Sequence, residues 1–402
     1  MINKNLIAPL IDKILPLVLL CLIISIPTSS TFRSIFLILS IVLIILNPVY
    51  QSLLYQYRKE PLMLVSVGIF LVAFLGCFYG DATFSEKIST LEKYTKFLFF
   101  PILIVAFYNR NFRFKALNTY LAIMTVVLII SFLKWTGFIK FGNPDLDHIF
   151  YNHIITGLMI GYAAYISASL AWSEDKKLKP IYILLLILFT FQIFFLNFGR
   201  TGYIIYVLLM SLFLIQTLSL RAALISLVAG LLIINTIYIY NPIMHNGINK
   251  IFKDIASYNK NNKETPIGQR LQFHDFSKKI FYRHPILGNG TSGFGHAFKL
   301  EKPVLSWGPN LAEPHSQYWL ILAEFGLFGS VMFILFLCAL FRSILQLKDM
   351  RMIAIGLFFM FLFGNLTDSL FYYSSTGVFF LTMMALCLGE QFDNNRRVTS
   401  NN

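Results

Sequence analysis

Apolar runs of close to 20 residues recur along the chain and are separated by short polar segments. These runs are continuous and lack the polar alternation of a barrel strand, so they predict transmembrane helices. Twelve runs fit this description, at residues 14–27, 34–50, 61–79, 95–108, 117–135, 152–172, 180–197, 201–217, 222–241, 316–342, 350–364 and 370–388. The pattern therefore predicts an all-α integral membrane protein with about twelve transmembrane helices.

One long polar segment interrupts this pattern. Residues 242–314 span 73 positions and hold ten Lys or Arg and five Asp or Glu. Two pieces, 248–258 and 268–282, look helical, and the remainder is rich in Gly, Pro and Asn. A segment of this size is too small to fold robustly by itself, so we expect it to pack onto the spans.

The expected organisation is a single membrane domain. Its parts are spans within 1–241, a loop at 242–314, spans within 315–390, and a disordered cytoplasmic tail at 391–402.

Charge sets the expected orientation. The chain carries a formal net charge of +14, although only 13% of its residues are charged. With the N-terminus in the cytoplasm, the cytoplasmic segments hold sixteen Lys or Arg, and the outer segments other than 242–314 hold seven. This bias predicts that both termini are cytoplasmic and that 242–314 is external. No basic stripe with interleaved aromatic residues lies outside the spans, so nucleic acid is not an expected partner.

Four cysteines all fall within apolar runs. This placement argues against a disulfide framework and against a cysteine-based zinc site.

In this orientation Lys96, Arg200, Arg270, His315 and Asp368 all fall on the outer side, at loops or span ends. Charged groups at a membrane span are costly, which makes a functional role the default hypothesis. A guanidinium group matches phosphate oxygens, and an imidazole can take a proton from a hydroxyl near neutral pH. The residues alone leave plainer interpretations open. Arg200 can be an interfacial charge, and Arg270 can be a solvated charge on a loop. His315 and Asp368 can be helix caps.

Two other features are expected to be structural. Glu324 follows His315 by nine residues, which is about 13 Å along a continuous helix and at membrane depth. The segment 288–293 fits G-x-G-x-x-G, but no strand is evident before it, so a tightly turning glycine loop is expected rather than a dinucleotide site. No nucleotide-binding motif and no clustered acidic metal site appears, so we expect no cofactor.

At these residues the chain resembles the bacterial O-antigen ligases, within the superfamily of O-antigen ligases and polymerases. The hallmark of that family is a histidine, then Asn, Ser or Gln, nine residues, and G-x-x-G. Here the motif is His315-Ser316, nine residues, and Gly326-Leu327-Phe328-Gly329, directly after the long polar segment. Looser matches are Gly-Arg-Thr-Gly-Tyr at 199–203, and Gly-Gln-Arg at 268–270 followed by 284–290. These motifs do not separate ligases from polymerases.

The resemblance implies a fold like that of the type C glycosyltransferases, in the bacterial inner membrane, with an active site that faces the periplasm. It implies a glycan donor on undecaprenyl pyrophosphate, an acceptor hydroxyl on the lipid A core of lipopolysaccharide, and no metal or nucleotide. His315 would be the general base, and Arg200 and Arg270 would bind the pyrophosphate. Further expected site residues are Lys96, Asp368, Tyr203 and Gln317.

Alternatives within the superfamily are an O-antigen polymerase and a protein O-oligosaccharyltransferase. A transporter or flippase is a weaker alternative, because the charged residues lie at span ends and do not line a path through the membrane.

Overall fold

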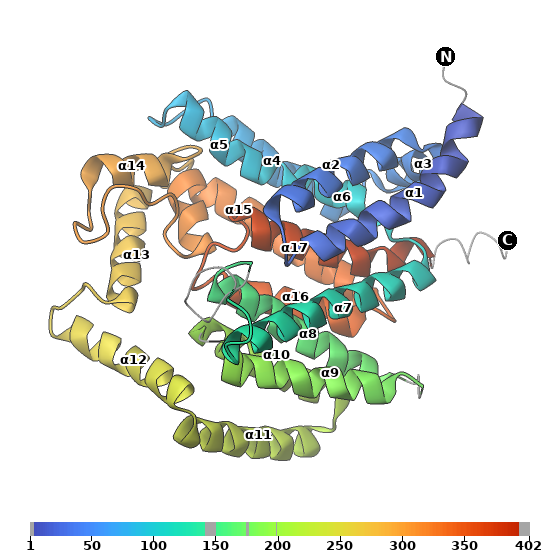
Figure 1. The fold of residues 1–402 in the computed structure, drawn as a ribbon. Helices are drawn as coiled ribbons and strands as arrows, with labels where there is room; N and C mark the ends of the chain where they lie inside the picture. Colours follow the sequence, from blue (N-terminus) through green and yellow to red (C-terminus); the bar gives the residue numbers. More distant parts are fainter. Residues whose placement is uncertain (1–3, 141–149, 174–176, 198, 394–402) are drawn as a thin grey trace.

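The structure is a computed structural model that describes residues 4–140, 150–173, 177–197 and 199–393. Within these ranges the chain is helical and has no strand, as the apolar runs predict (Figure 1). The helices are α1 (Lys4–Ser25), α2 (Ser30–Leu46), α3 (Pro48–Tyr57), α4 (Pro61–Gly76), α5 (Phe84–Tyr94), α6 (Lys96–Ala106), α7 (Arg110–Trp135), α8 (His153–Trp172), α9 (Lys179–Phe191) with the π-helical turn η1 (Gln192–Leu196), α10 (Arg200–Thr217), α11 (Leu220–Tyr240), α12 (Pro242–Asn259), α13 (Pro266–Arg283), α14 (Gly293–Glu301), α15 (Gln317–Leu345), α16 (Arg351–Gly364) and α17 (Ser374–Leu388). The predicted tail 391–402 lies outside the described residues from position 394 onward.

The expected membrane fold is confirmed, but the count of twelve spans is not. Eight described helices are long and apolar enough to cross a membrane, or nine if α2 and α3, bent by 87° at Asn47, form one span. Helices α6 and α16 have only 11 and 14 residues. At 1.5 Å per residue they measure about 16 and 21 Å, against about 30 Å of hydrocarbon. Their sequences are apolar also because most of their residues are buried within the bundle.

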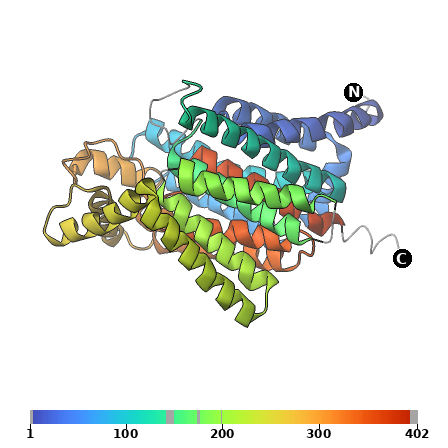
Figure 2. The ribbon, with the colours of Figure 1, turned by 60° about the horizontal axis from the view of Figure 1, so that its bottom comes forward.

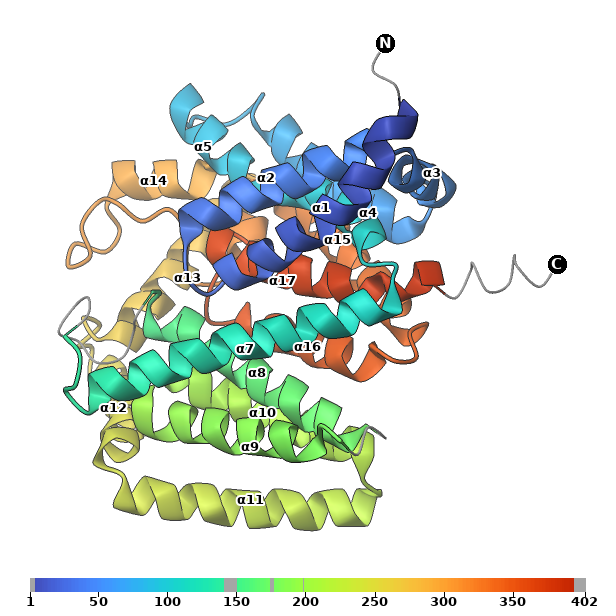
Figure 3. The same cartoon turned by 45° about the vertical axis from the view of Figure 1, so that its right-hand side comes forward.

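The helices form a bundle in which α8 is central and α11 is peripheral. Helix α8 is buried along nearly all of its length and packs against α9, α10 and α16. Helix α11 lies at the edge, and Ala223 is its only buried residue in the described chain (Figures 2 and 3). Helix α1 begins and α17 ends at one end of the bundle, and α12, α13 and α14 cover the opposite end (Figure 1).

The segment 242–314 folds into three helices. Helices α12 and α13 contain the two predicted pieces, whereas α14 was not predicted, and neither were α3 and α5. Helix α13 begins at Pro266, directly after Thr265, whose hydroxyl accepts the backbone N–H of Gly268. Helices α13 and α14 share an apolar core with the start of α15, built largely from phenylalanines.

Helix α15 is broken at Gly326, which has φ 59° and ψ −154°. The predicted span 316–342 is therefore not one unbroken helix, although the helix is continuous from Gln317 through Glu324, as expected. Glu324 is completely buried, two residues before the break. The part after the break, 327–345, is about 28 Å long and can cross the membrane by itself. The part of α15 before the break is thus not needed for the span and can form part of the end of the bundle.

The segment 284–290 satisfies the backbone groups that the break leaves unpaired. Leu327 and Phe328 donate their N–H groups to the carbonyl oxygens of Pro285 and Ile286, at 2.8 and 3.0 Å. In return, Gly290 donates its N–H to the carbonyl oxygen of Glu324 at 2.8 Å. Gly288 and Gly290 adopt φ of 71° and 80°, so the expected tight glycine loop is confirmed.

We expect Gly326→Ala to destabilise the protein. An added Cβ would lie 2.5 Å from the carbonyl oxygen of Ile286, on a residue with positive φ. Backbone strain and overpacking together predict a loss of about 2–4 kcal/mol in unfolding free energy. Gly230→Ala in α11 is the matched control, because an added Cβ there meets no atom within 4 Å. Thermal unfolding in detergent tests this, and equal melting temperatures for both variants would contradict it.

Candidate active site

The start of α15 is fastened to the link between α16 and α17. Ser316 is the residue before the helix, and its hydroxyl donates to the carbonyl oxygen of Asn365 at 3.3 Å. The N–H of Gln317 donates to the same oxygen at 3.0 Å, and its side-chain oxygen accepts the N–H of Tyr372 at 3.0 Å. These bonds bring His315 and Asp368 together, although 53 residues separate them.

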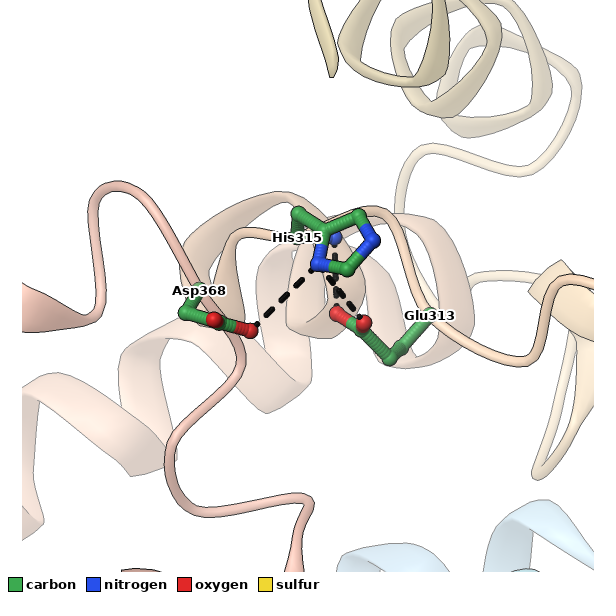
Figure 4. A group of neighbouring side chains, drawn as sticks. All are labelled: Glu313, His315 and Asp368. Atoms are coloured by element: carbon green, nitrogen blue, oxygen red, sulfur yellow. Dashed lines mark hydrogen bonds and ion pairs between the residues drawn. The ribbon is translucent and has the colours of Figure 1, made fainter. Parts of the chain in front are cut away.

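The centre of the site is His315 with two carboxylates (Figure 4). The Nδ1 atom of His315 lies 3.2 Å from Oε1 of Glu313 and 3.4 Å from Oδ1 of Asp368. The backbone N–H of His315 donates to Oε2 of Glu313 at 2.7 Å. The histidine side chain is 17% exposed, whereas those of Glu313 and Asp368 are 4% and 8% exposed. Solvent therefore reaches this group mainly through the imidazole.

The backbone of His315 is strained. Its φ is 54°, in the left-handed region that residues with a Cβ seldom adopt. Such strain costs about 1–3 kcal/mol and persists where the surroundings enforce it, often at functional sites. Here the carboxylate of Glu313 and the bonds of Ser316 and Gln317 to Asn365 enforce it.

Lys96 supports the cluster of Glu313, His315 and Asp368 indirectly. Its ammonium is buried and donates to the carbonyl oxygens of Phe371 at 2.6 Å and Tyr373 at 3.1 Å. The hydroxyl of Tyr373 donates to Oε1 of Glu313 at 2.6 Å. Lys96 thus reaches the histidine only through intervening residues and holds the link before α17 in place.

Aromatic rings from the segment 242–314 surround the imidazole. The ring centroids of Phe273 and Trp307 lie 5.9 and 6.1 Å from that of His315. His274 follows Phe273 on α13 and packs beside Trp319, and burial lowers the pKa of its imidazole. Neutral His274 is therefore the expected form near pH 7.

The two predicted arginines lie on other elements. Arg200 is the first residue of α10, is 28% exposed, and lies 3.5 Å from a carboxylate oxygen of Asp254 on α12. Arg270 lies on α13, one turn before His274, and is half-buried. Neither arginine has a hydrogen bond or ion pair with His315 in the described chain.

Tyr203 lies apart from the imidazole. Its hydroxyl donates to the carbonyl oxygen of Asn197, and its ring stacks on Phe194. Tyr203 therefore fastens the start of α10 to the end of η1.

The interpretations of His315 and Asp368 as helix caps are both wrong. Ser316, not His315, precedes α15 as its N-cap. Tyr373, not Asp368, is the N-cap of α17, and Asp368 instead turns toward the imidazole.

The residues missed from the sequence are Glu313, Tyr373, Trp307 and His274. The one local signal was the spacing Glu-Pro-His, which puts an acid two residues before the base.

One imidazole nitrogen and two carboxylates also form a possible cation site. The three ligand atoms from Glu313, His315 and Asp368 lie within 4.8 Å of one another, and such donors suit a divalent ion. The same geometry is satisfied without an ion if Nδ1 carries a proton that the carboxylates accept.

A separate cavity of about 650 Å³ lies on the other side of α14. It is lined by residues that include Tyr79, His284, His296 and Glu301. Since Phe294 and Phe298 point from α14 into the core beside His315, this cavity is distinct from the histidine site.

Part of the chain matches a known protein family. A family model described as O-Antigen ligase matches residues 183–334, more than a third of the chain. The matched region includes Arg200, Arg270, Glu313 and His315, and ends before Asp368. No curated protein matches the sequence.

We expect Lys96→Met to destabilise the protein. The variant keeps the length of the side chain but leaves the carbonyl groups of Phe371 and Tyr373 without their donor. Unsatisfied buried carbonyls predict a loss of about 2–4 kcal/mol. Lys93→Met is the control, because Lys93 stacks on the ring of Tyr372 and donates to neither of these carbonyl groups. Thermal unfolding measures both, and a stable but inactive Lys96→Met protein would instead assign Lys96 to the chemistry.

Proposed function

We propose, from the membership of this chain in the superfamily of O-antigen ligases and polymerases, that it is an O-antigen ligase. It would transfer a glycan from undecaprenyl pyrophosphate to a sugar hydroxyl of the lipid A core during lipopolysaccharide biosynthesis. The observation that carries the proposal is the His315 imidazole, held between two buried carboxylates with one face toward solvent. The site would face the periplasm from the inner membrane, with both termini in the cytoplasm.

The reaction is a displacement at an anomeric carbon. Nε2 of His315 takes the proton of the acceptor hydroxyl, and the hydroxyl oxygen attacks the anomeric carbon of the donor glycan. The bond from that carbon to the phosphate oxygen breaks, and undecaprenyl pyrophosphate leaves with the electron pair. A single displacement inverts the anomeric centre.

The carboxylates assist proton transfer to the imidazole. When Nε2 takes a proton, the ring becomes a cation that faces Glu313 and Asp368 at 3.2 and 3.4 Å. The negative charge of the carboxylates thus lies beside the positive charge that the ring gains in this step. A general base of this kind contributes about 10²–10⁴-fold to the rate.

Arg200 and Arg270 are proposed to bind the pyrophosphate. Its negative charge grows as the glycosidic bond breaks, and guanidinium groups already in place stabilise that charge without reorganisation. Arg200 has one weak ion pair, at 3.5 Å, and remains partly exposed. An incoming pyrophosphate can therefore compete with Asp254 for it. Arg270 lies on α13, three residues before Phe273, whose ring centroid lies 5.9 Å from that of His315, so it belongs to the helix that borders the base.

Loss of the His315 or the Arg200 side chain should abolish transfer. In a strain that lacks the protein, wild type should restore O-antigen on the lipid A core, while His315→Ala and Arg200→Ala should not. A fall of about 10²–10⁴-fold is expected from loss of the base. Arg283→Ala is the control, because Arg283 pairs with Glu301 at an exposed surface. The readout is lipopolysaccharide separated on a gel and blotted for O-antigen, with the protein level measured in membranes.

The same gel separates the alternatives. In the strain without the protein, bare core with polymer left on the carrier lipid indicates a ligase. Core with a single repeat unit indicates a polymerase instead. An unchanged ladder would exclude both and favour a protein O-oligosaccharyltransferase or a transporter.

Transfer by the purified protein should persist in excess EDTA. The imidazole nitrogen and both carboxylates already satisfy one another when Nδ1 carries a proton. Activity that disappears with EDTA and returns with Mg²⁺ or Mn²⁺ would contradict this, and Glu313, His315 and Asp368 would then be the candidate ligands of the ion.

A further inference from the structure

We infer that Glu313 is a positioning residue, which holds the His315 ring with its proton on Nδ1 and thereby leaves Nε2 free to act as the base. This inference rests on the proposed function only for the role of Nε2. The position of the proton can be tested without any transfer assay.

Glu313 contacts His315 at two points. One carboxylate oxygen accepts the backbone N–H at 2.7 Å, and the other lies 3.2 Å from Nδ1 of the ring. The carboxylate therefore fixes both the backbone, which has a φ of 54°, and the orientation of the ring. No other side chain in the described chain bonds both the backbone and the ring of this histidine.

The partners of Nδ1 determine its protonation. An ionised carboxylate can only accept hydrogen bonds, and Nδ1 faces two of them. Nδ1 must therefore be the donor, and in the neutral ring Nε2 carries the lone pair. The contacts of the ring to both carboxylates run from Nδ1, and none is drawn at Nε2 (Figure 4).

Glu313 is itself held firmly. The hydroxyl of Tyr373 donates to its Oε1 at 2.6 Å, and the carbonyl oxygen of Tyr373 is bound by buried Lys96. The Glu313 side chain is 4% exposed, so little of it is accessible to a substrate. It acts through His315 and is not a catalytic residue.

Asp368 makes the other contact to Nδ1, and this contact has the geometry of a hydrogen bond. Its Oδ1 lies 3.4 Å from Nδ1 and also accepts the N–H of Ser369 at 3.0 Å. Its contact with His315 is to the ring alone. Removal of the charge from Glu313 should therefore disturb the histidine more than the same change at Asp368.

The test compares Glu313→Gln with Asp368→Asn in the full-length protein, in detergent. Glutamine has nearly the same shape but can turn its NH₂ group toward Nδ1, which would move the ring proton to Nε2. Protein with ¹⁵N-labelled histidine reports the tautomer by NMR, and a His315 variant assigns the signal among the seven histidines. We expect Nδ1–H in wild type and a raised fraction of Nε2–H in Glu313→Gln, where Asp368 still faces Nδ1, with a smaller change in Asp368→Asn.

Kinetics with a lipid-linked glycan donor provide the second readout. Glu313→Gln should lower kcat by about 10–100-fold, as loss of outer residues that orient a reactive group commonly does, with little change in KM. Glu301→Gln is the matched control, because Glu301 pairs with Arg283 and Lys279 away from the site. Tyr373→Phe removes a single hydroxyl and should lower kcat in the same direction, by a smaller factor. This variant decides the question if Glu313→Gln fails to fold.

Two results would overturn the inference. The first is an Nε2–H tautomer in wild type, and the second is an unchanged tautomer and kcat in Glu313→Gln or, if that variant does not fold, in Tyr373→Phe. If wild type has the Nδ1–H tautomer but transfers no glycan to lipid A core, the proposed function fails while the assignment of Glu313 stands.

Discussion

The backbone groups freed at Gly326 have to be satisfied, because an unpaired N–H or C=O is costly in an apolar interior. The segment 284–290 supplies the partners, with carbonyl groups for one side of the break and N–H groups for the other. This exchange fastens α13 and α14 to α15. The aromatic residues of α13 then lie beside the histidine at the start of α15. Without the break, His315 would begin a long straight helix and would lack these neighbours.

Much of the fold was predictable from apolar runs, since a membrane helix is marked by composition alone. Helices α6 and α16 show where that signal becomes ambiguous. A helix buried within a bundle is as apolar as one in lipid, so sequence cannot separate a short internal helix from a full span. Helix α14 was missed because its glycines resemble a loop, and its position depends on contacts with distant residues.

The candidate site was predictable only in part. His315 was found from its motif, and Asp368 only as a charge at a span end. Their contact depends on Asn365, which bonds both Ser316 and Gln317 through its carbonyl oxygen. Backbone contacts of this kind cannot be recognised from residue types. Glu313 was two residues from the histidine, yet only the left-handed φ of His315 lets its carboxylate reach the backbone and ring together.

The exposure of α11 has a consequence for how the protein responds to its membrane. A helix with Ala223 as its one buried residue in the described chain has little packing to fix its tilt. Tilting is one way in which such a helix accommodates a bilayer of different thickness. Helix α12 follows directly after Asn241 and carries Asp254, the ion-pair partner of Arg200. A change in the tilt of α11 would therefore displace the ion-pair partner of an arginine that belongs to a different helix.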